Sequence, residues 1–123
     1  MDTIYREQLM EHFKNPLNKG DLHDHNAENT KRNQLCGDIV RIQLKVAGGI
    51  IADAKFDGPA CAVSTASSSI LTDYIKGKNL TEAKNISKDD LLNLLGVELT
   101  TSRIKCATLS LEALKDAIEG YEG

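Results

Sequence analysis

The sequence lacks long hydrophobic runs, a secretion leader and an excess of positive charge. Its longest uninterrupted apolar stretches are only a few residues, which excludes a transmembrane helix. The first residues, MDTIYREQLM, include acidic side chains and do not have the basic-then-apolar order of a signal peptide. With 15 basic and 18 acidic residues, the net charge of −3 argues against nucleic acid as the main partner, and no basic amphipathic helix indicates a membrane surface. These absences predict a cytoplasmic globular protein that binds neither nucleic acid nor a membrane.

Repeats, low-complexity tracts and linkers are also missing, since the chain has only two prolines and neither lies in a linker-like segment. Its 123 residues match the usual size of one domain, and a chain of this length buries about two-thirds of the surface that it exposes when unfolded. Apolar residues make up 41% of the sequence, which is too many for a disordered chain. We therefore expect residues 1–123 to form a single domain that needs neither a disulfide nor a metal merely to fold.

The clearest pattern in the chain predicts a β-hairpin. Apolar and polar residues alternate over 40–46 and again over 50–56, which is the period of half-buried strands. Gly48 and Gly49, between the two segments, supply the positive φ angles of a tight turn. If these glycines form a two-residue loop, the numbers of paired residues sum to 97.

Helical spacing is found on both sides of this hairpin. Residues 3–13 form one expected helix, and the polar segment 15–34 that follows is expected to be an extended connection with one short edge strand. Further helices are expected over 64–75, after Leu80, from the capping box at Ser87 to Gly96, and along the apolar stripe from Ala107 to Tyr121. This order predicts an α+β fold, in which a small three-stranded antiparallel sheet is packed by helices on one face.

Only three cysteines are present, at positions 36, 61 and 106. Disulfides are rare in reducing cytosol, so these thiols are expected to serve packing, metal binding or catalysis. The numbers 36 and 61 sum to 97, so Cys36 and Cys61 are expected to lie opposite each other, or nearly so if a bulge shifts the register. Cys36 and Asp38 are two residues apart, so an extended chain points both to one face. A carboxylate and two thiols are therefore predicted to meet at the open end of the hairpin.

Two of the thiols lie where helices are expected to begin. Cys61 comes just before the helix near Ser64, and Cys106 is expected in the first turn of the terminal helix. Unpaired N–H groups and the positive end of the helix dipole favour a thiolate at such positions. Arg103 and Lys105, beside Cys106, act in the same direction. Both thiols are thus predicted to be reactive.

Three unrelated core cysteines are the competing interpretation, because a free cysteine is often a small buried residue. Cys36 is flanked by polar residues and glycine, and Cys61 lies in a Gly-Pro-Ala turn, both poor core positions. The spacings of 25 and 45 residues match no C-x-x-C zinc pattern, so spacing alone leaves the question open. The Ser67-Ser68-Ser69 run lacks the G-x-S-x-G elbow of a catalytic serine, so it is a poor candidate for a nucleophile. His23 and His25 lie on a polar loop, where solvent-exposed histidines are more common than a metal site.

Five segments of the sequence are distinctive when taken together: NPLNKG at 15–20, LCGD at 35–38, DAKFDGPACAVSTASSS at 53–69, KGK at 76–78 and RIKCATLSLEAL at 103–114. In this order, and with the three cysteines in register, they resemble the U-type iron–sulfur cluster assembly proteins. That family includes IscU, SufU and the N-terminal domain of NifU. The resemblance covers essentially the whole chain, so it is far more specific than any single motif.

This resemblance implies a scaffold or sulfur acceptor. In the family, a cysteine desulfurase hands over persulfide sulfur, and apo iron–sulfur proteins or carrier proteins receive the product. Carried over position by position, Cys36, Asp38, Cys61 and Cys106 are the expected ligands of zinc, iron or a transient [2Fe–2S] cluster, and the three cysteines are the candidates for accepting the persulfide. Soft thiolates suit zinc and iron–sulfur clusters, and a carboxylate in place of one thiolate is a harder, more exchangeable ligand.

The branch of the family stays open on sequence grounds. Isc-type scaffolds have a histidine just before the third cysteine, whereas Lys105 stands there in this chain, as is usual in the Suf-type branch. The short spacing between the second and third cysteines is instead typical of the Isc type. The segment VELTTS at 97–102 replaces the proline-rich chaperone-recognition segment of Isc scaffolds. A protonated lysine cannot bind a metal, so Lys105 is expected to act electrostatically on nearby thiolate, persulfide or cluster charge.

Three functions are therefore compatible with the sequence. The leading one is a scaffold that accepts persulfide sulfur and assembles or relays a transient [2Fe–2S] cluster. The alternative is a zinc-dependent sulfur acceptor, a sulfurtransferase partner of the desulfurase, with no scaffold role. A structural zinc-binding interaction module is the third. Either a monomer or a weak homo-oligomer fits all three.

Overall fold

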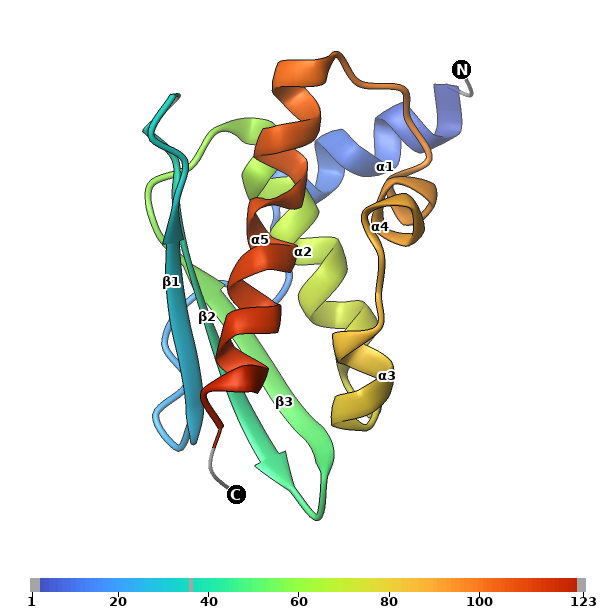
Figure 1. Ribbon diagram of the computed structural model, residues 1–123. Coiled ribbons are helices and arrows are strands. Elements are labelled where there is room, and N and C mark those ends of the chain that lie inside the picture. Colours follow the sequence, from blue (N-terminus) through green and yellow to red (C-terminus); the bar gives the residue numbers. More distant parts are fainter. Residues whose placement is uncertain (1–2, 36, 122–123) are drawn as a thin grey trace.

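The fold is a three-stranded antiparallel sheet with helices packed on one face (Figure 1). The computed structural model describes residues 3–35 and 37–121. The sheet has the order β1-β2-β3, and its elements run along the chain as α1 (Thr3–Lys14), β1 (Ala27–Arg32), β2 (Ile39–Ala47), β3 (Ile50–Asp57), α2 (Ala62–Ile75), α3 (Leu80–Lys84), α4 (Lys88–Leu95) and α5 (Thr101–Glu119). The α+β prediction is confirmed. Among the described residues, no helix is long and apolar enough to cross a membrane.

The hairpin between β2 and β3 has the predicted turn, but its register changes along the ladder. Next to the turn, Ala47 pairs with Ile50 and Val46 with Ile51, which fits the predicted sum of 97. An irregularity follows between Lys45 and Val46, and from Lys45–Asp53 onward the pairs sum to 98. A bulge of this kind adds one residue to one strand and bends it. The bulge therefore moves β3 by one residue relative to β2 at the end where the cysteines lie.

The main hydrophobic core lies between the sheet and the helices α2 and α5. Alternate residues of β2 face inward and are buried, as the period of two predicts. Burying an aliphatic side chain of this size contributes about 1.5–3 kcal/mol, so this layer is the principal source of stability. Its largest fully buried members include Ile42, Leu44, Ile51, Leu71, Ile75, Leu111 and Leu114.

Helix α2 packs closely on α5 through small hydroxyl residues. The Ser67 hydroxyl donates to the Ala107 carbonyl on α5, and the Ser68 hydroxyl donates to the Ser64 carbonyl within α2 at 2.7 Å. His12 on α1 lies 2.7 Å from the Ser69 hydroxyl through its Nδ1 atom. The serine run therefore serves helix packing, and the small side chains let the backbones of α2 and α5 approach each other.

Helix α4 begins and ends as the sequence predicts. Ser87 is the N-cap residue of a capping box, in which its N–H donates to Asp90 at 2.9 Å and its hydroxyl accepts from the Asp90 N–H at 3.0 Å. These hydrogen bonds hold the pKa of Asp90 below its usual value. Gly96 ends the helix in the left-handed conformation, with a φ of 69°. The α4–α5 connection that follows leads to the third cysteine.

Candidate metal centre

Cys61 is held at the start of helix α2. The strand β3 ends at Asp57, a short turn follows, and Cys61 is the N-cap residue of α2 with φ −68° and ψ 171°. Its Sγ atom accepts a hydrogen bond from the Ser64 N–H at 3.5 Å. An N-cap side chain satisfies one of the unpaired N–H groups of the first turn, and here sulfur takes that role. The prediction that Cys61 immediately precedes a helix is confirmed.

Asp38 lies just before β2 and is buried, with only 5% of the residue exposed. One carboxylate oxygen accepts the Cys61 N–H at 2.9 Å, and the other lies 2.9 Å from the Ser64 hydroxyl. A buried carboxylate is tolerated in a protein only when hydrogen bonds or opposite charges replace its lost hydration. The start of α2 supplies these bonds, and it thereby ties the beginning of β2 to the cysteine at the N-terminus of the helix.

Cys106 reaches the same place from α5, but not from its first turn. The helix begins at Thr101, so Cys106 is its sixth residue, and the prediction of a first-turn position is wrong. Because helix-dipole effects fall off within the first turn, unpaired N–H groups of α5 do not act on this thiol. Cys106 is instead 7% exposed and packs in a small hydrophobic cluster separate from the main core. That cluster consists of Val63, Leu95, Cys106 and Ala107, with Leu9, Cys61, Ile70, Leu92, Val97 and Leu99 packed against it.

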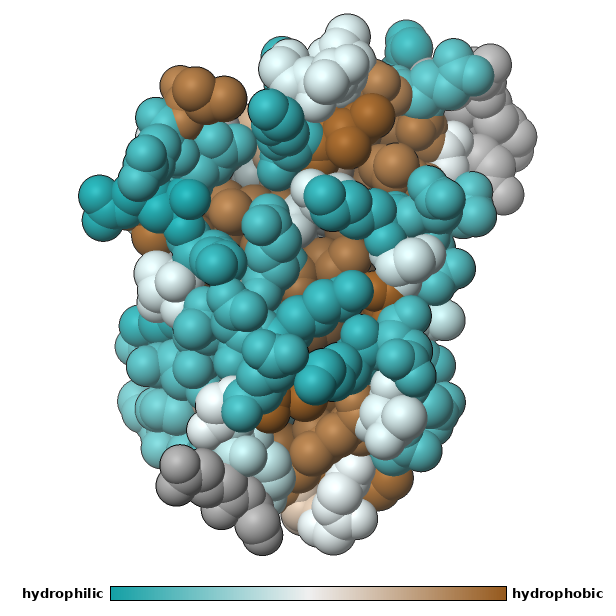
Figure 2. Space-filling model, in the orientation of Figure 1, coloured by the Kyte–Doolittle hydropathy of each residue, from teal (hydrophilic) through white to brown (hydrophobic). Residues whose placement is uncertain are grey.

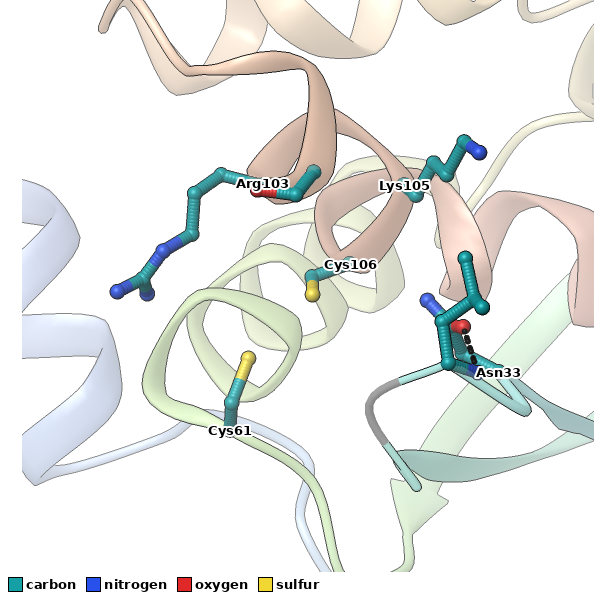
Figure 3. Close-up of a pocket in the computed structure, with 7 residues that line it drawn as sticks. Asn33, Cys61, Arg103, Lys105 and Cys106 are labelled. Carbon is teal, nitrogen blue, oxygen red and sulfur yellow. Dashed lines mark hydrogen bonds between the residues drawn. The ribbon is translucent and has the colours of Figure 1, made fainter.

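The donor atoms of Asp38, Cys61 and Cys106 all lie within 4.8 Å of one another. Figure 3 shows the sulfur atoms of the two cysteines directed toward each other from α2 and α5. Ligands of a tetrahedral zinc are about 3.8 Å apart, given Zn–S bonds of about 2.3 Å, so the group is only slightly wider than a closed site. Two thiols and a carboxylate are also a donor set that zinc and iron accept. These residues therefore fit a metal ion, and no second group of this kind occurs in the described part of the chain.

The two thiols line a pocket of about 350 Å³ that opens to solvent. Its other lining residues are Asn33, Leu35, Ser102, Arg103 and Lys105. Among the described residues that line it, none is a carboxylate and two are cations, and the hydrophobic cluster lies behind the sulfur atoms. Figure 2 shows hydrophobic side chains reaching the surface at this end of the molecule, where α5 begins. The site thus has apolar side chains behind the sulfur atoms, an opening through which a partner can approach, and a positively charged rim formed by Arg103 and Lys105.

Lys105 and Arg103 lie at the rim rather than over the sulfur atoms. In Figure 3 the side chains of Lys105 and Arg103 extend to opposite sides of the pocket, and both charged ends point away from the thiols. Lys105 also lines a neighbouring hollow of about 330 Å³ with Arg32 and Lys88. A fourth cation of that hollow, Lys31, is tied to Asp116 at 2.8 Å, and this hydrogen bond raises the pKa of Lys31. The electrostatic role of Lys105 stays a prediction, and from this position Lys105 would act on the thiols through the local potential and not through direct contact.

Cys36 lies outside the described residues, so its place as a fourth ligand stays a prediction. The chain on its C-terminal side is described: the Gly37 N–H donates to the Asn33 carbonyl at 2.8 Å, and Ile39 donates to the Pro59 carbonyl at 3.0 Å. The residue numbers of Ile39 and Pro59 sum to 98, so this contact continues the shifted register of the β2–β3 ladder. On that register Cys61 stands across from position 37 and not from 36, and Cys61 has by then left the ladder to cap α2. A shift of one residue is the bulge for which the prediction allowed, and Cys61 itself caps α2 instead of pairing in the ladder.

Sequence reasoning missed Ser64, which contacts Asp38, Cys61 and Cys106. In the sequence, the serine run at 67–69 is the more conspicuous feature because of its repetition. The signal for Ser64 is its position three residues after an N-cap residue, where the backbone N–H points at the capping side chain. His23 and His25 take no part in the site, since neither belongs to a metal-binding group among the described residues.

The fold and this site define a class of protein, an α+β domain with a candidate thiol–carboxylate metal centre at one end of its sheet. The family model described as NifU-like N terminal domain matches residues 4–123. Among curated proteins, the chain is 41% identical to the zinc-dependent sulfurtransferase SufU of Bacillus subtilis, covering 100% of this chain and 95% of that protein. It is 39% identical to the iron–sulfur cluster assembly scaffold protein IscU of Escherichia coli K12, covering 96% and 94%. The chain therefore belongs to the NifU-like N-terminal domain family of iron–sulfur cluster assembly proteins.

Solved structures share the fold of this chain. A crystal structure of a hypothetical protein, 32% identical, superposes with a TM-score of 0.81 and covers 97% of this chain and 99% of that one. The N-terminal part of a NifU-like protein from Brucella abortus, 24% identical, shows the same fold with a TM-score of 0.80 over 94% and 92% of the two chains. The alignment with SufU spans 140 positions, more than the 123 residues of this chain, so that relative carries residues that this chain lacks.

Proposed function

We propose that this protein accepts persulfide sulfur from a cysteine desulfurase and assembles or relays a transient [2Fe–2S] cluster. The observation that carries the proposal is the group formed by Asp38, Cys61 and Cys106, whose donor atoms lie within 4.8 Å of one another. The pocket in front of the two thiols leaves room for a sulfur-carrying segment of the desulfurase. Cys36 is the fourth ligand in this proposal. The protein acts in the cytoplasm, and apo iron–sulfur proteins or carrier proteins receive the cluster.

Sulfur transfer at this site is a thiol exchange. A cysteine thiolate of the protein attacks the terminal sulfur of the desulfurase persulfide, a new S–S bond forms, and the S–S bond of the donor breaks. The electron pair of the broken bond leaves on the donor cysteine as a thiolate, so no oxidant or reductant is needed. Of the two described thiols, Cys61 is the more exposed, whereas Cys106 is buried against the hydrophobic cluster.

The carboxylate ligand suits a cluster that must leave again. Stable clusters have four thiolates, and a carboxylate oxygen binds iron as a harder and more exchangeable ligand. Asp38 is held in place by the Cys61 N–H and faces the Ser64 hydroxyl. Even so positioned, a carboxylate is a more exchangeable ligand for iron than a thiolate, so the metal is released more readily than from a fourth thiolate. This property supports a carrier of transient clusters rather than a permanent electron-transfer site.

A zinc-dependent sulfur acceptor with no scaffold role is the second candidate. The 41% identical relative bears the name zinc-dependent sulfurtransferase, and Lys105 stands where Isc-type scaffolds have a histidine. Three cysteines and an aspartate form a complete tetrahedral set for zinc, and a bound zinc keeps its thiol ligands ionised. Both candidates share persulfide acceptance, and they differ in whether a cluster forms.

The experiment that tests the proposal has two arms, both on the purified full-length chain. The first exposes the protein to a cysteine desulfurase with free cysteine, and we expect a mass gain of one sulfur atom on Cys36, Cys61 or Cys106. The second is anaerobic reconstitution with iron and sulfide, followed by absorption spectroscopy, which we expect to show a [2Fe–2S] cluster. Sulfur uptake without a cluster would favour the zinc-dependent acceptor. No uptake in any metal state would reject both candidates.

Chelation separates these functions from a structural zinc module. The main core between the sheet, α2 and α5 contains none of the three donors, so we expect a chelator to leave the protein folded and to loosen only the end of the molecule with the thiols. Far-ultraviolet circular dichroism and thermal melts, with and without chelator, measure this. A structural metal site is instead coupled to folding, so its removal would abolish the cooperative melt.

Lys105→Ala tests the electrostatic role of the rim. Because Lys105 is exposed and its charged end points away from the sulfur atoms, we expect sulfur transfer to slow by only about two- to fivefold at low salt. The difference should shrink at high salt, because the Debye length falls to about 3 Å at 1 M. Lys115→Ala, further along α5, is the matched control. Equal sulfur-transfer rates for Lys105→Ala and the wild type at low salt would show that Lys105 has no electrostatic role in sulfur transfer.

A further inference from the structure

One buried residue, Ser64, touches all three described ligand residues, Cys61 through its backbone N–H and Asp38 and Cys106 through its hydroxyl. The Ser64 N–H donates to the Cys61 sulfur at 3.5 Å. Its hydroxyl oxygen lies 2.9 Å from Oδ2 of Asp38 and 2.7 Å from the carbonyl oxygen of Cys106. Ser64 is 1% exposed, so water does not compete for these contacts. The starts of β2 and α2 and the second turn of α5 therefore meet at a single residue.

The hydroxyl of Ser64 faces two acceptors with one proton. A serine hydroxyl donates one hydrogen bond, while the carboxylate of Asp38 and the carbonyl of Cys106 both accept. The proton therefore serves one acceptor at a time, and rotation about the C–O bond exchanges them. When the hydroxyl donates to Asp38, it holds Oδ2 in place. When it donates to the Cys106 carbonyl, it ties α5 to α2.

We propose that Ser64 is a positioning residue that sets the affinity of the metal centre by orienting Asp38 toward Cys61 and Cys106. Residues that hydrogen-bond to metal ligands fix ligand orientation, and their loss costs about 10- to 100-fold in metal affinity. The inference rests on the proposed function only in taking Asp38 as a metal ligand. It needs no cluster and no sulfur transfer.

The test is a competition experiment with a chromogenic zinc chelator on metal-free, reduced protein. We expect Ser64→Ala to weaken zinc binding by about 10- to 100-fold. The matched control is Ser67→Ala, which removes a buried hydroxyl from the same helix and the same α2–α5 contact but touches none of the three ligands. Ser67→Ala is expected to bind zinc as the wild type does. Thermal melts of the metal-free variants report any general loss of packing.

A second pair of measurements separates positioning from packing. In an Asp38→Ala background, Ser64→Ala should cause no further loss of zinc affinity, because the carboxylate that it orients is gone. If Ser64→Ala does not fold, Ser64→Thr and Ser64→Val replace it. These two variants have the same shape and differ in the hydroxyl, so we expect the valine variant to bind zinc at least tenfold more weakly than the threonine variant.

Several outcomes would overturn the inference. They are unchanged affinity in Ser64→Ala, equal losses in Ser64→Ala and Ser67→Ala, a full loss that persists without Asp38, or a wild-type protein that binds no zinc. Failure of the proposed function looks different: the protein would take no sulfur from a desulfurase, while the serine variants would still differ in zinc affinity.

Discussion

Replacing Cys61 with serine should weaken metal binding by about 100- to 1,000-fold and leave the fold intact. Cys61 is the N-cap residue of α2 and its sulfur accepts the Ser64 N–H, a role that serine fills at least as well. A serine hydroxyl does not replace a thiolate as a zinc or iron ligand. Zinc-binding free energies of about 10–16 kcal/mol, spread over four ligands, give a loss of about 100- to 1,000-fold in affinity for one ligand. Chelator competition measures the affinity, and a thermal melt of the metal-free protein measures the fold.

Cys106→Ser is the informative comparison. We expect the same loss of metal affinity, but also a lower melting temperature of the metal-free protein, because this thiol packs among apolar side chains and a buried hydroxyl without a good partner costs about 1–3 kcal/mol. Ser110→Ala, one turn further along α5, changes a buried hydroxyl that makes no hydrogen bond within the described residues, and it should bind metal normally. Wild-type affinity in Cys61→Ser would mean that the observed group is not the metal centre.

Much of the fold could be predicted because the signals are local. The alternation in β2, the Gly48-Gly49 turn and the capping box at Ser87 each depend on a few neighbouring residues, and all three are confirmed. In β3 the predicted alternation fails next to the turn, where Ile51 is buried and Ile50 and Ala52 are exposed. The register shift between Lys45 and Val46 is different, since a bulge depends on how the whole hairpin twists against the helices. It could not be predicted from alternation alone.

The start of α5 was misplaced for a similar reason. The helix begins at Thr101, before the apolar stripe that indicated it, and the Thr100 side chain makes no capping hydrogen bond. The apolar stripe therefore predicted a first-turn position for Cys106, which lies in the second turn of α5. The meeting of Asp38 and Cys61 was predicted, but the hydrogen bond between the Asp38 carboxylate and the Cys61 N–H that holds them together was not. Ser64 was missed because its role arises only when three distant segments pack together.

Gly58→Ala should destabilise the protein more than any other glycine-to-alanine change whose surroundings the structure describes. Gly58 has a φ of +126°, and a Cβ built there would lie 2.3 Å from the carbonyl oxygen of Ile39, which is backbone. An L-residue at that angle costs about 1–3 kcal/mol, and relieving the contact requires the chain to move, at about 1–3 kcal/mol more. We expect the free energy of unfolding to fall by about 3 kcal/mol, measured by chemical denaturation of the metal-free protein.

The same change should weaken the metal centre, because Gly58 lies where the two ligand-bearing segments approach. Ile39 donates to the Pro59 carbonyl at 3.0 Å, and this bond joins the residue after Asp38 to a residue two before Cys61. Pushing the strands apart here moves the carboxylate away from the thiol. The matched control is Gly48→Ala, which also has a positive φ of +59° but has no atom within 4 Å of the added Cβ. The control should lose only about 1 kcal/mol, from backbone strain, and keep its metal affinity. Equal destabilisation by both substitutions would show that strain alone acts at Gly58 and that the close approach of the two strands does not hold the site together.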